Sequence, residues 1–502
     1  MLAKIRSSAL LGIDAMEVSV EVDASPGLPG ETIVGLPDTV VKESRNRIKA
    51  ALKHSGFEYP VKFYTINLAP AEIAKEGAFL DLPIAVGILQ ATGQVDTKPD
   101  SLFVGELSLD GEVKPIRGMI SICQMAVQKG VKRVFFPEQS VIHTDFFPEL
   151  LFYPMRSLKE MFQYLRSDIP PPVMKRKEGK RFLFGDMDFE EVKGQFVAKR
   201  VAEIAAAGGH NVLFCGPPGS GKTMIIQRFP TILPDMDREE AIETFKIHNV
   251  AQNGGKHSSF YLSRPFRAPH HSISYAGLVG GGKNPRPGEI SLAHNGVLFL
   301  DELPEFPRNV VEVLRQPLEE KKVTICRAAC SIHFPARFML LAAMNPCPCG
   351  YFGDQKQICQ CHSSQIQKYW KKVSGPLLDR IDLYLEVPRV RGEDFNEQSD
   401  SHANSFSSEK MKKRISQSRQ IQAIRFGRVK TNSDMNSREV EKSCFLAPPL
   451  RTFLNDVLEK GILTARSYQK VLKVARTIAD LDQKEGIEKS HLSEALQYRK
   501  FR

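Results

Sequence analysis

The octapeptide GPPGSGKT, residues 216–223, places the strongest constraint on how this 502-residue chain can fold. It fits the phosphate-loop pattern, in which glycines frame a turn and a lysine and a hydroxyl residue close it. The apolar residues NVLFC (211–215) before it predict a buried strand, and TMIIQRF (223–229) predicts a helix after it. A strand, this loop and a helix in that order indicate a nucleotide-binding α/β module. The alternative is a glycine-rich turn that contains a lysine by chance, and it fits the flanking segments poorly.

The residue types of this loop suit a bound triphosphate. Glycines let backbone N–H groups curl around phosphate oxygens at the positive end of the following helix. Lys222 can reach the outer phosphates, and the hydroxyl of Thr223 can bind Mg²⁺. ATP and Mg²⁺ are therefore the expected cofactors. The residues expected to hold the nucleotide are Gly216, Pro217, Pro218, Gly219, Ser220, Gly221, Lys222 and Thr223.

A second apolar run, GVLFLDELPEF (296–306), predicts a buried parallel strand that ends in two acidic residues. Ligands collect at the carboxyl edge of an open α/β sheet. Asp301 is expected to hold Mg²⁺ through water, and Glu302 to orient and polarise the attacking water. An acidic pair at a strand end is common on any protein surface, but the phosphate loop favours the functional interpretation.

Three further polar residues are candidates for the reaction. A third strand, RFMLLAAMNP, ends in Asn345, whose amide could hold the water or the terminal phosphate, although Asn-Pro alone favours a turn. Arg380 and Arg466 are candidates for contact with phosphate, since an arginine supplied by a neighbour can be worth ~10³–10⁵ in rate. The alternative for Arg380 is an ion pair with Asp379 or Asp382, although neighbours along a strand point to opposite faces.

Together these segments resemble the magnesium-chelatase-like AAA+ ATPases of the YifB/ComM group. The segments that carry the resemblance are GPPGSGKT, GVLFLDELPEF, AAMNPCPCGY, SGPLLDRIDL and ARSYQKVLKVARTIADL, with GLPDTVVKESRNRIKAAL and NLAPAEIAKEGAFLDLPIAVGIL near the N-terminus. The resemblance covers nearly the whole chain except about residues 390–440. It implies an α/β P-loop AAA+ module with a C-terminal helical lid. A Lon-protease-like α+β domain, of the ribosomal S5 domain 2 type, would precede the module.

The resemblance also implies how the site residues divide between subunits. In this family the nucleotide lies between neighbours in a hexameric ring. Arg380 would be the finger that reaches the neighbour's phosphate, and Arg466 the sensor from the helical lid. The residues that would act within their own subunit are Lys222, Thr223, Asp301, Glu302 and Asn345.

The expected function follows from the same resemblance. It implies an ATPase that works as an ATP-dependent hexameric DNA motor, a helicase or branch-migration translocase in recombination during natural transformation. Single-stranded or branched DNA would be its partner, and the formal net charge of +11 favours a polyanionic partner. The alternative is a chelatase-type or unfoldase AAA+ motor that remodels a protein partner. The sequence has no apolar run near ~18 residues and no signal-peptide pattern, so we expect a cytoplasmic protein without a membrane partner.

At about 150 residues per domain, the chain is long enough for roughly three domains. We expect a Lon-protease-like domain at 1–165, which we predict to be proteolytically inactive, and a proline-rich and basic linker at 166–185. The AAA+ core would occupy 186–390, a polar flexible connector 391–408, and the helical lid 409–502.

The N-terminal segment lacks the residues that proteolysis would need. A Lon-type protease uses a serine activated by a lysine. The stretch AKEGAFLDLPIA (74–85) has no serine, and Ile120 occupies the position that corresponds to the lysine. Lys114 is the only lysine in the surrounding segment GEVKPIRGMISI. We therefore expect a scaffold or a DNA-binding attachment.

Four of the nine cysteines cluster in the segment NPCPCGYFGDQKQICQC. Cys347, Cys349, Cys359 and Cys361 form two C-x-C pairs nine residues apart, and four thiolates in one loop can hold a structural Zn²⁺. His362 is a substitute ligand, and a loop with reduced thiols is the alternative. A zinc ion here would brace the loop that runs from Asn345 towards Arg380.

Two segments combine basic and aromatic residues in a way that suits a nucleic-acid strand. They are SRPFRAPHHSISYAGLVGGGKNPRPGE (263–289) and the predicted hairpin KKVTICRAACSIHFPAR (321–337). Basic side chains neutralise phosphates, and aromatic side chains stack on bases. The alternative is contact with a neighbouring subunit or the nucleotide. The candidates for DNA contact are Lys283, Arg286, Lys321, Lys322 and Arg327.

Overall fold

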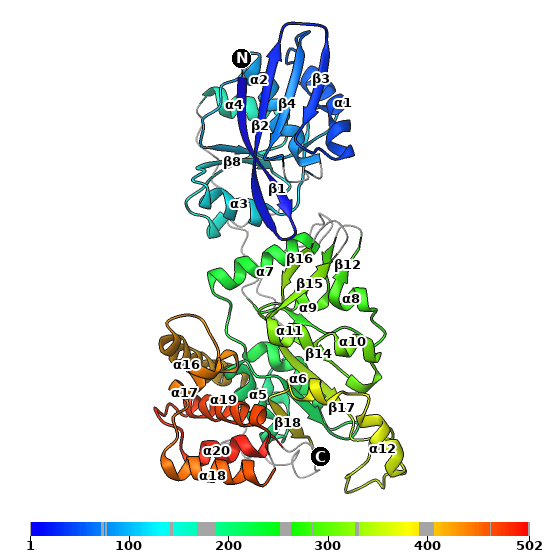
Figure 1. The fold of residues 1–502 in the computed structure, drawn as a ribbon, viewed down its shortest axis with the longest axis vertical. Helices are drawn as coiled ribbons and strands as arrows, with labels where there is room; N and C mark the ends of the chain where they lie inside the picture. The colour runs from blue at the N-terminus through cyan, green and yellow to red at the C-terminus, as the bar shows by residue number, and fades with distance from the viewer. Residues whose placement is uncertain are drawn as a thin grey trace. The chain divides into compact units, whose positions relative to one another are not determined.

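The chain divides into two compact units, residues 1–179 with 238–260, and residues 180–237 with 261–502. Figure 1 draws the chain as a ribbon. The computed structural model describes residues 2–71, 75, 78–140, 144–167, 187–251, 263–282, 285–326, 331–390, 406–461 and 463–499. No described helix is both long and apolar enough to cross a lipid bilayer.

The first unit is built on a mixed seven-stranded sheet in the order β3-β4-β2-β1-β5-β8-β9. Apolar and polar residues alternate along its longest strand, so that every second side chain of β2 from Val18 to Ala24 is buried. The strands are β1 (Leu2–Leu11), β2 (Asp14–Ser25), β3 (Gly30–Val34), β4 (Phe63–Ala69), β5 (Ser101–Phe103), β8 (Arg133–Pro137) and β9 (Leu151–Met155). The helices that go with it are α1 (Thr39–His54), α2 (Asp81–Ala91), α3 (Met119–Gln128) and α4 (Leu158–Ser167).

Ile120 and Lys114, at the positions where a Lon-type lysine is expected, have structural roles in this unit. Ile120 lies in α3 and is only 1% exposed. Lys114 ends the short strand β7 (Val113–Lys114), where its ammonium lies 2.6 Å from the Glu112 carboxylate. In the described part of this region, one of these positions therefore holds a buried apolar side chain and the other a lysine in a surface ion pair.

Helix α7 (Arg238–Ala251) belongs to the first unit, although it lies within the range 186–390 expected to form the AAA+ core. Lys246 Nζ lies 2.7 Å from Asp14 Oδ1, and the Gly118 N–H donates to Asn249 Oδ1 at 2.6 Å. A helical pattern in the sequence does not indicate which unit the helix packs against. The other expected domain boundaries stay predictions.

The second unit contains a five-stranded parallel sheet in the order β11-β14-β17-β10-β18. The strand β10, which comes first in the chain, therefore lies between β17 and β18, which come last. Every residue of the three central strands is buried, as a parallel sheet covered on both faces requires. The strand predicted at 211–215 is confirmed, and so is the strand predicted for the apolar residues before Asp301. The strands are β10 (Val212–Cys215), β11 (Phe266–Arg267), β14 (Val297–Leu300), β17 (Met339–Met344) and β18 (Leu383–Glu386).

Helices and two small hairpins complete the second unit. Its hydrophobic core joins strand residues such as Phe214 to helical residues such as Ala475. The hairpins pair β12 (Gly280–Gly281) with β13 (Arg286–Pro287), and β15 (Lys322–Cys326) with β16 (Ser331–Pro335). The longer helices are α5 (Phe196–Gly208), α6 (Lys222–Ile232), α16 (Ser408–Phe426), α18 (Pro448–Glu459), α19 (Ala465–Leu481) and α20 (Lys489–Gln497). The expected connector 391–408 lies largely outside the described residues.

Candidate nucleotide-binding site

The phosphate loop has the backbone shape that its glycines permit. Gly219 and Gly221 have positive φ angles of 75° and 88°, a conformation that disfavours side chains. At Gly216 a Cβ would lie 2.3 Å from the Val387 carbonyl oxygen, so the loop can pass there only without a side chain. Gly221 caps α6, which places Lys222 in the first turn of the helix. The predicted order of strand, loop and helix is confirmed.

Lys222 points into its own loop. Its ammonium donates to the carbonyl oxygens of Gly216 at 2.7 Å and Pro217 at 2.9 Å, and to Asn345 Oδ1 at 3.4 Å. The residue is only 8% exposed, and burial lowers the pKa of its ammonium. A buried cation inside a turn of backbone N–H groups is suited to bind an anionic ligand.

Thr223 and Asp301 come from neighbouring elements and meet at the carboxyl edge of the sheet. Thr223 Oγ1 donates to Asp301 Oδ2 at 3.0 Å, and Asp301 Oδ1 accepts the Glu302 N–H at 2.9 Å. Hydroxyl and carboxylate oxygens are ligands that Mg²⁺ prefers. Their donor set fits Mg²⁺.

Glu302 has an unusual backbone conformation. Its φ and ψ are 52° and 46°, a left-handed conformation that is uncommon for residues other than glycine and is enriched at functional sites. Its carboxylate is exposed and lies 3.7 Å from His271 Nδ1. The sequence by itself does not single out His271, whose only signal is the His270–His271 pair in a basic segment. The ring centroids of these two histidines are 4.0 Å apart.

Asn345 follows β17, the strand beside β10, and therefore lies next to the phosphate loop. It accepts a hydrogen bond from Lys222, as described above. Parallel strands bring their carboxyl ends to one edge of a sheet. The structure thus brings together the phosphate loop, Asp301, Glu302 and Asn345, while their catalytic roles stay predictions.

Arg380 lies at the opposite edge of this sheet. It precedes β18, and its carbonyl oxygen accepts from Asn211 Nδ2 at 3.0 Å, where Asn211 is the residue before β10. The four residues of β10, at about 3.3 Å each, put roughly 13 Å between this edge and the phosphate loop. Arg380 therefore does not reach the phosphate loop of the same chain.

The guanidinium of Arg380 pairs with neither of the aspartates considered from the sequence. Its Nη2 lies 2.7 Å from Glu319 Oε2, and its Nε donates to the Arg315 carbonyl at 2.9 Å. Asp382 is bound instead by Lys470 Nζ, at 2.7 Å. The expected alternative of a pair with Asp382 is wrong, because that carboxylate is turned into the core.

Arg466 is at the start of α19 and shares the same carboxylate, since it also forms an ion pair with Glu319. One turn further along this helix, Lys470 Nζ donates to the Ile381 carbonyl oxygen at 3.1 Å. These contacts fix the first turn of α19 to the amino edge of the sheet. Both candidate arginines therefore lie on the side away from their own phosphate loop.

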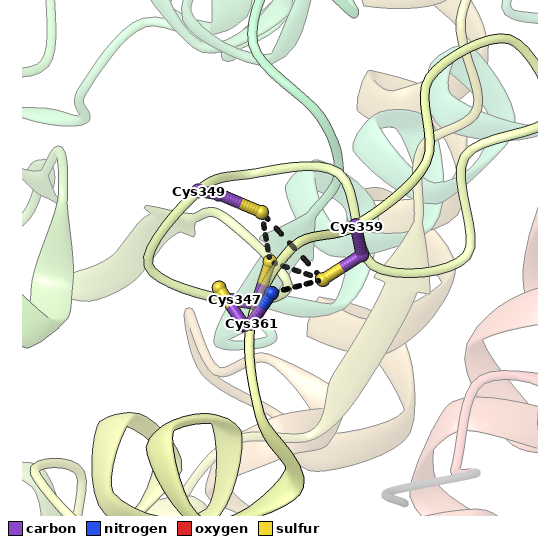
Figure 2. Close-up of side chains that lie close together, drawn as sticks. All are labelled: Cys347, Cys349, Cys359 and Cys361. Atoms are coloured by element: carbon purple, nitrogen blue, oxygen red, sulfur yellow. Dashed lines mark hydrogen bonds between the residues drawn. The ribbon is translucent and has the colours of Figure 1, made fainter.

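The four clustered cysteines come together in the loop after β17 (Figure 2). Their sulfur atoms all lie within 4.8 Å of one another. The Cys347–Cys349, Cys347–Cys359 and Cys349–Cys359 sulfur distances are 3.3, 3.6 and 3.5 Å. Among the described residues this group is made of the four cysteines and does not include His362. The cluster is compatible with a zinc site.

The predicted DNA contacts differ in how far the structure describes them. Arg286 on β13 and Lys322 on β15 are exposed. Lys321 caps α11 (Arg315–Glu320), and its Nζ lies 3.5 Å from Asp434 Oδ1, so an internal ion pair already engages it. Lys283 and Arg327 lie outside the described residues.

Comparison with known proteins gives a consistent result along the chain. Residues 188–395 match the family described as magnesium chelatase, subunit ChlI, residues 20–140 match subunit ChlI of Mg-chelatase, and residues 405–499 match the ChlI C-terminal family. The chain is 42% identical over 504 residues to the competence protein ComM of Haemophilus influenzae, which covers 99% of this chain and 97% of that protein. The chain belongs to the YifB/ComM family of magnesium-chelatase-like AAA+ proteins.

Two other relatives extend this result. The protein YifB of Escherichia coli (strain K12) is 41% identical over 511 residues, 99% of this chain and 97% of that protein. A Lon protease of Trichlorobacter lovleyi is 24% identical over 170 residues, 32% of this chain and 21% of that protein. Family membership points to ATPase activity with ATP and Mg²⁺, and the phosphate loop of this YifB/ComM-family chain has the residues that such activity needs.

Proposed function

We propose that this chain is an ATP-driven DNA motor that works as a homo-hexamer, with each nucleotide bound between two subunits. The observation that carries the proposal is the placement of the arginines. Arg380 and Arg466 lie at the amino edge of the parallel sheet, whereas the phosphate loop lies at its carboxyl edge. A site that needs these arginines must take them from a neighbour, and a ring closes such head-to-tail contacts.

In the proposed site each residue has a task that its position supports. Lys222 and the N–H groups of the loop bind the phosphates, and Thr223 with Asp301 would hold Mg²⁺, which neutralises phosphate charge when it is bound. Glu302 orients and polarises the attacking water, and Asn345 holds that water or the terminal phosphate. The neighbour's arginines stabilise the charge that spreads over the transferred group.

Three features favour DNA over a protein as the partner. The chain has a net charge of +11, and the hairpins of the second unit expose Arg286 and Lys322. Cations at exposed hairpins suit a phosphate backbone. The name of the Haemophilus relative, a competence protein, supports a role in recombination during natural transformation, with helicase or branch-migration activity. The first unit would be a non-proteolytic scaffold or DNA attachment, since Ile120 replaces the lysine that a Lon-type site needs.

The ATPase rate with different partners tests the proposal. Purified chain is assayed alone, with single-stranded DNA, with forked DNA and with an unfolded protein, at one moderate salt concentration. We expect DNA to bind and to raise the rate, and the Glu302→Gln variant to bind DNA and ATP without turnover. Stimulation by unfolded protein alone, without DNA binding, would instead support a motor that remodels proteins.

A further inference from the structure

We propose that Cys347, Cys349, Cys359 and Cys361 bind one Zn²⁺, and that this ion holds the phosphate loop and Asn345 in place. The first part concerns metal binding alone. The second part rests on the proposed nucleotide site, because it says how the metal acts there.

The sulfur atoms are too far apart for a disulfide and close enough together to surround one tetrahedral metal ion. A disulfide joins sulfur atoms at about 2.05 Å, and the three contacts in this cluster are 3.3 to 3.6 Å. Four sulfur atoms at about 2.3 Å from a central Zn²⁺ lie roughly 3.8 Å apart. In addition, the Cys361 N–H donates to Cys359 Sγ at 3.4 Å, which orients that sulfur atom.

The cluster closes a loop that begins and ends at the nucleotide site. Cys347 is buried and lies two residues after Asn345, while Cys361 lies two residues before helix α12 (Ser363–Trp370). The last residue of that helix contacts the start of the loop again, since Trp370 Nε1 donates to the Pro346 carbonyl oxygen at 3.0 Å. A metal ion at the cysteines therefore ties both ends of this loop to Asn345.

A second contact connects the cluster to the phosphate loop itself. Gly350, which follows Cys349, has a φ of 88°, and a Cβ there would lie 2.6 Å from Pro218 Cδ. The backbone of the cysteine loop thus packs directly on the phosphate loop. The far side of the cysteine loop is held by Arg389, whose Nε lies 2.7 Å from Asp354 Oδ2 and whose guanidinium lies over the Tyr351 ring.

Metal content of the full chain, purified without chelator, tests the first part. We expect about one zinc per chain, released by a mercurial thiol reagent and read by a colorimetric metal indicator. Cys359→Ser and Cys361→Ser change half-buried residues and should lose the metal. Cys326→Ser, at an exposed cysteine outside the cluster, should keep it. Refilling the metal-free chain with Co²⁺ should give the absorption of tetrahedral cobalt thiolate.

The proposal would be overturned if the chain were purified without metal and then bound neither Zn²⁺ nor Co²⁺ more tightly than Cys359→Ser does. It would also be overturned if the thiols of the cluster reacted with a disulfide reagent as fast as the thiol of Cys326 does. The thiol measurement uses the wild-type chain alone, so it does not depend on whether a variant folds.

The affinity for a fluorescent ATP analogue tests the second part. Zinc-free wild type should bind the analogue about tenfold more weakly than zinc-loaded chain, the loss typical when a supporting shell is removed. Gly350→Ala should keep zinc yet weaken binding, since its methyl group displaces Pro218. Equal affinity with and without zinc would overturn this part. If zinc-loaded wild type bound no ATP analogue, the proposed function would fail while the metal result stood.

Discussion

Arg380 Nη2 lies 2.7 Å from Glu319 Oε2, and the other oxygen of that carboxylate pairs with Arg466. One acidic residue on α11 therefore gathers two cations from segments that are far apart in the chain. Charge-assisted hydrogen bonds of this kind fix the direction of a guanidinium. Glu319 thus presents both arginines as one unit at the amino edge of the sheet.

Mixed rings test whether Arg380 acts on a neighbour's nucleotide. Lys222→Ala subunits lack a working phosphate loop, and Arg380→Ala subunits lack the donated guanidinium, so each variant alone should lose activity, by about 10³-fold for Arg380→Ala. When the two variants are co-assembled at equal amounts, up to about a quarter of the interfaces pair an intact phosphate loop with an intact Arg380. We expect the ATPase rate to recover accordingly. A rate that stays at the sum of the two separate variants would contradict donation between subunits.

Glu319→Gln tests the positioning of the arginine pair. We expect kcat to fall about tenfold, or 1.4 kcal/mol, because both guanidinium groups lose their common anchor. The Kd for nucleotide should not change, since Glu319 lies on the edge away from Lys222. Glu320→Gln is the matched control, because among the described residues its side chain accepts from Gln316 alone. An altered Kd with an unchanged kcat would argue against a positioning role.

Thr223→Val removes a hydroxyl while keeping the shape of the side chain. Thr223 Oγ1 lies 3.0 Å from Asp301 Oδ2, so we expect the variant to need at least about tenfold more Mg²⁺ for half-maximal ATPase activity. Thr223→Ser keeps the hydroxyl and should remain close to wild type. A Mg²⁺ titration of the ATPase rate measures the difference. Identical titrations of Thr223→Val and wild type would remove Thr223 from the metal site.

Asp382→Ala should destabilise the second unit by about 3–5 kcal/mol, the usual cost of breaking a buried ion pair. The carboxylate is bound by Lys470 Nζ at 2.7 Å and by the Asn211 N–H at 3.0 Å. Denaturant unfolding measures the loss, and Asp379→Ala, at an exposed aspartate, is the control. Equal midpoints for the two variants would mean that the buried pair contributes nothing.

The same pair sets a pH dependence. Burial by itself would raise the pKa of Asp382, but Lys470 and His210 together lower it well below its usual value of 3.8. A depressed carboxyl pKa stabilises the fold above the unfolded pKa, and this stabilisation is lost as the pH falls through the folded pKa. The difference in stability between wild type and Asp382→Ala should therefore be constant near neutral pH and shrink below about pH 4.

Arg286→Ala and Lys322→Ala test the proposed contact with DNA. Each removes one exposed cation from a hairpin, so the slope of log affinity against log salt should become shallower by about 1 per residue. The loss should be similar for different DNA sequences, because phosphate contacts carry no sequence information. Lys413→Ala, at an exposed lysine on α16, is the control for net charge. Unchanged slopes in both hairpin variants would place DNA elsewhere.

Local sequence patterns predicted the carboxyl edge of the sheet well. The glycines, Lys222 and Thr223 are neighbours in the chain, and the strands that precede Asp301 and Asn345 are short apolar runs of the kind that is typical of a buried parallel sheet. The four cysteines could be grouped for the same reason, since one short loop contains them all.

Relationships across the fold could not be predicted in this way. Glu319 stands in a polar helix with no pattern that points to Arg380, 61 residues further on, or to Arg466. The sequence suggests Asp382 as the partner of Arg380 instead, because the two are close in the chain. Asp382 faces the core, where it forms an ion pair with Lys470 of α19. Such pairs depend on which elements the topology brings together.

The assignment of α7 to the first unit has a practical consequence for dissecting this protein. The chain passes from one unit to the other three times, near residues 179, 237 and 260, so the two units are interleaved rather than strung in sequence. Truncation in the proline-rich linker would separate the N-terminal fragment from α7, whose Asn249 accepts a hydrogen bond from the Gly118 N–H. The helix would then remain on the other fragment without this contact. Separate expression of the two units should therefore succeed only if α7 is kept with the first unit, where it packs against α3.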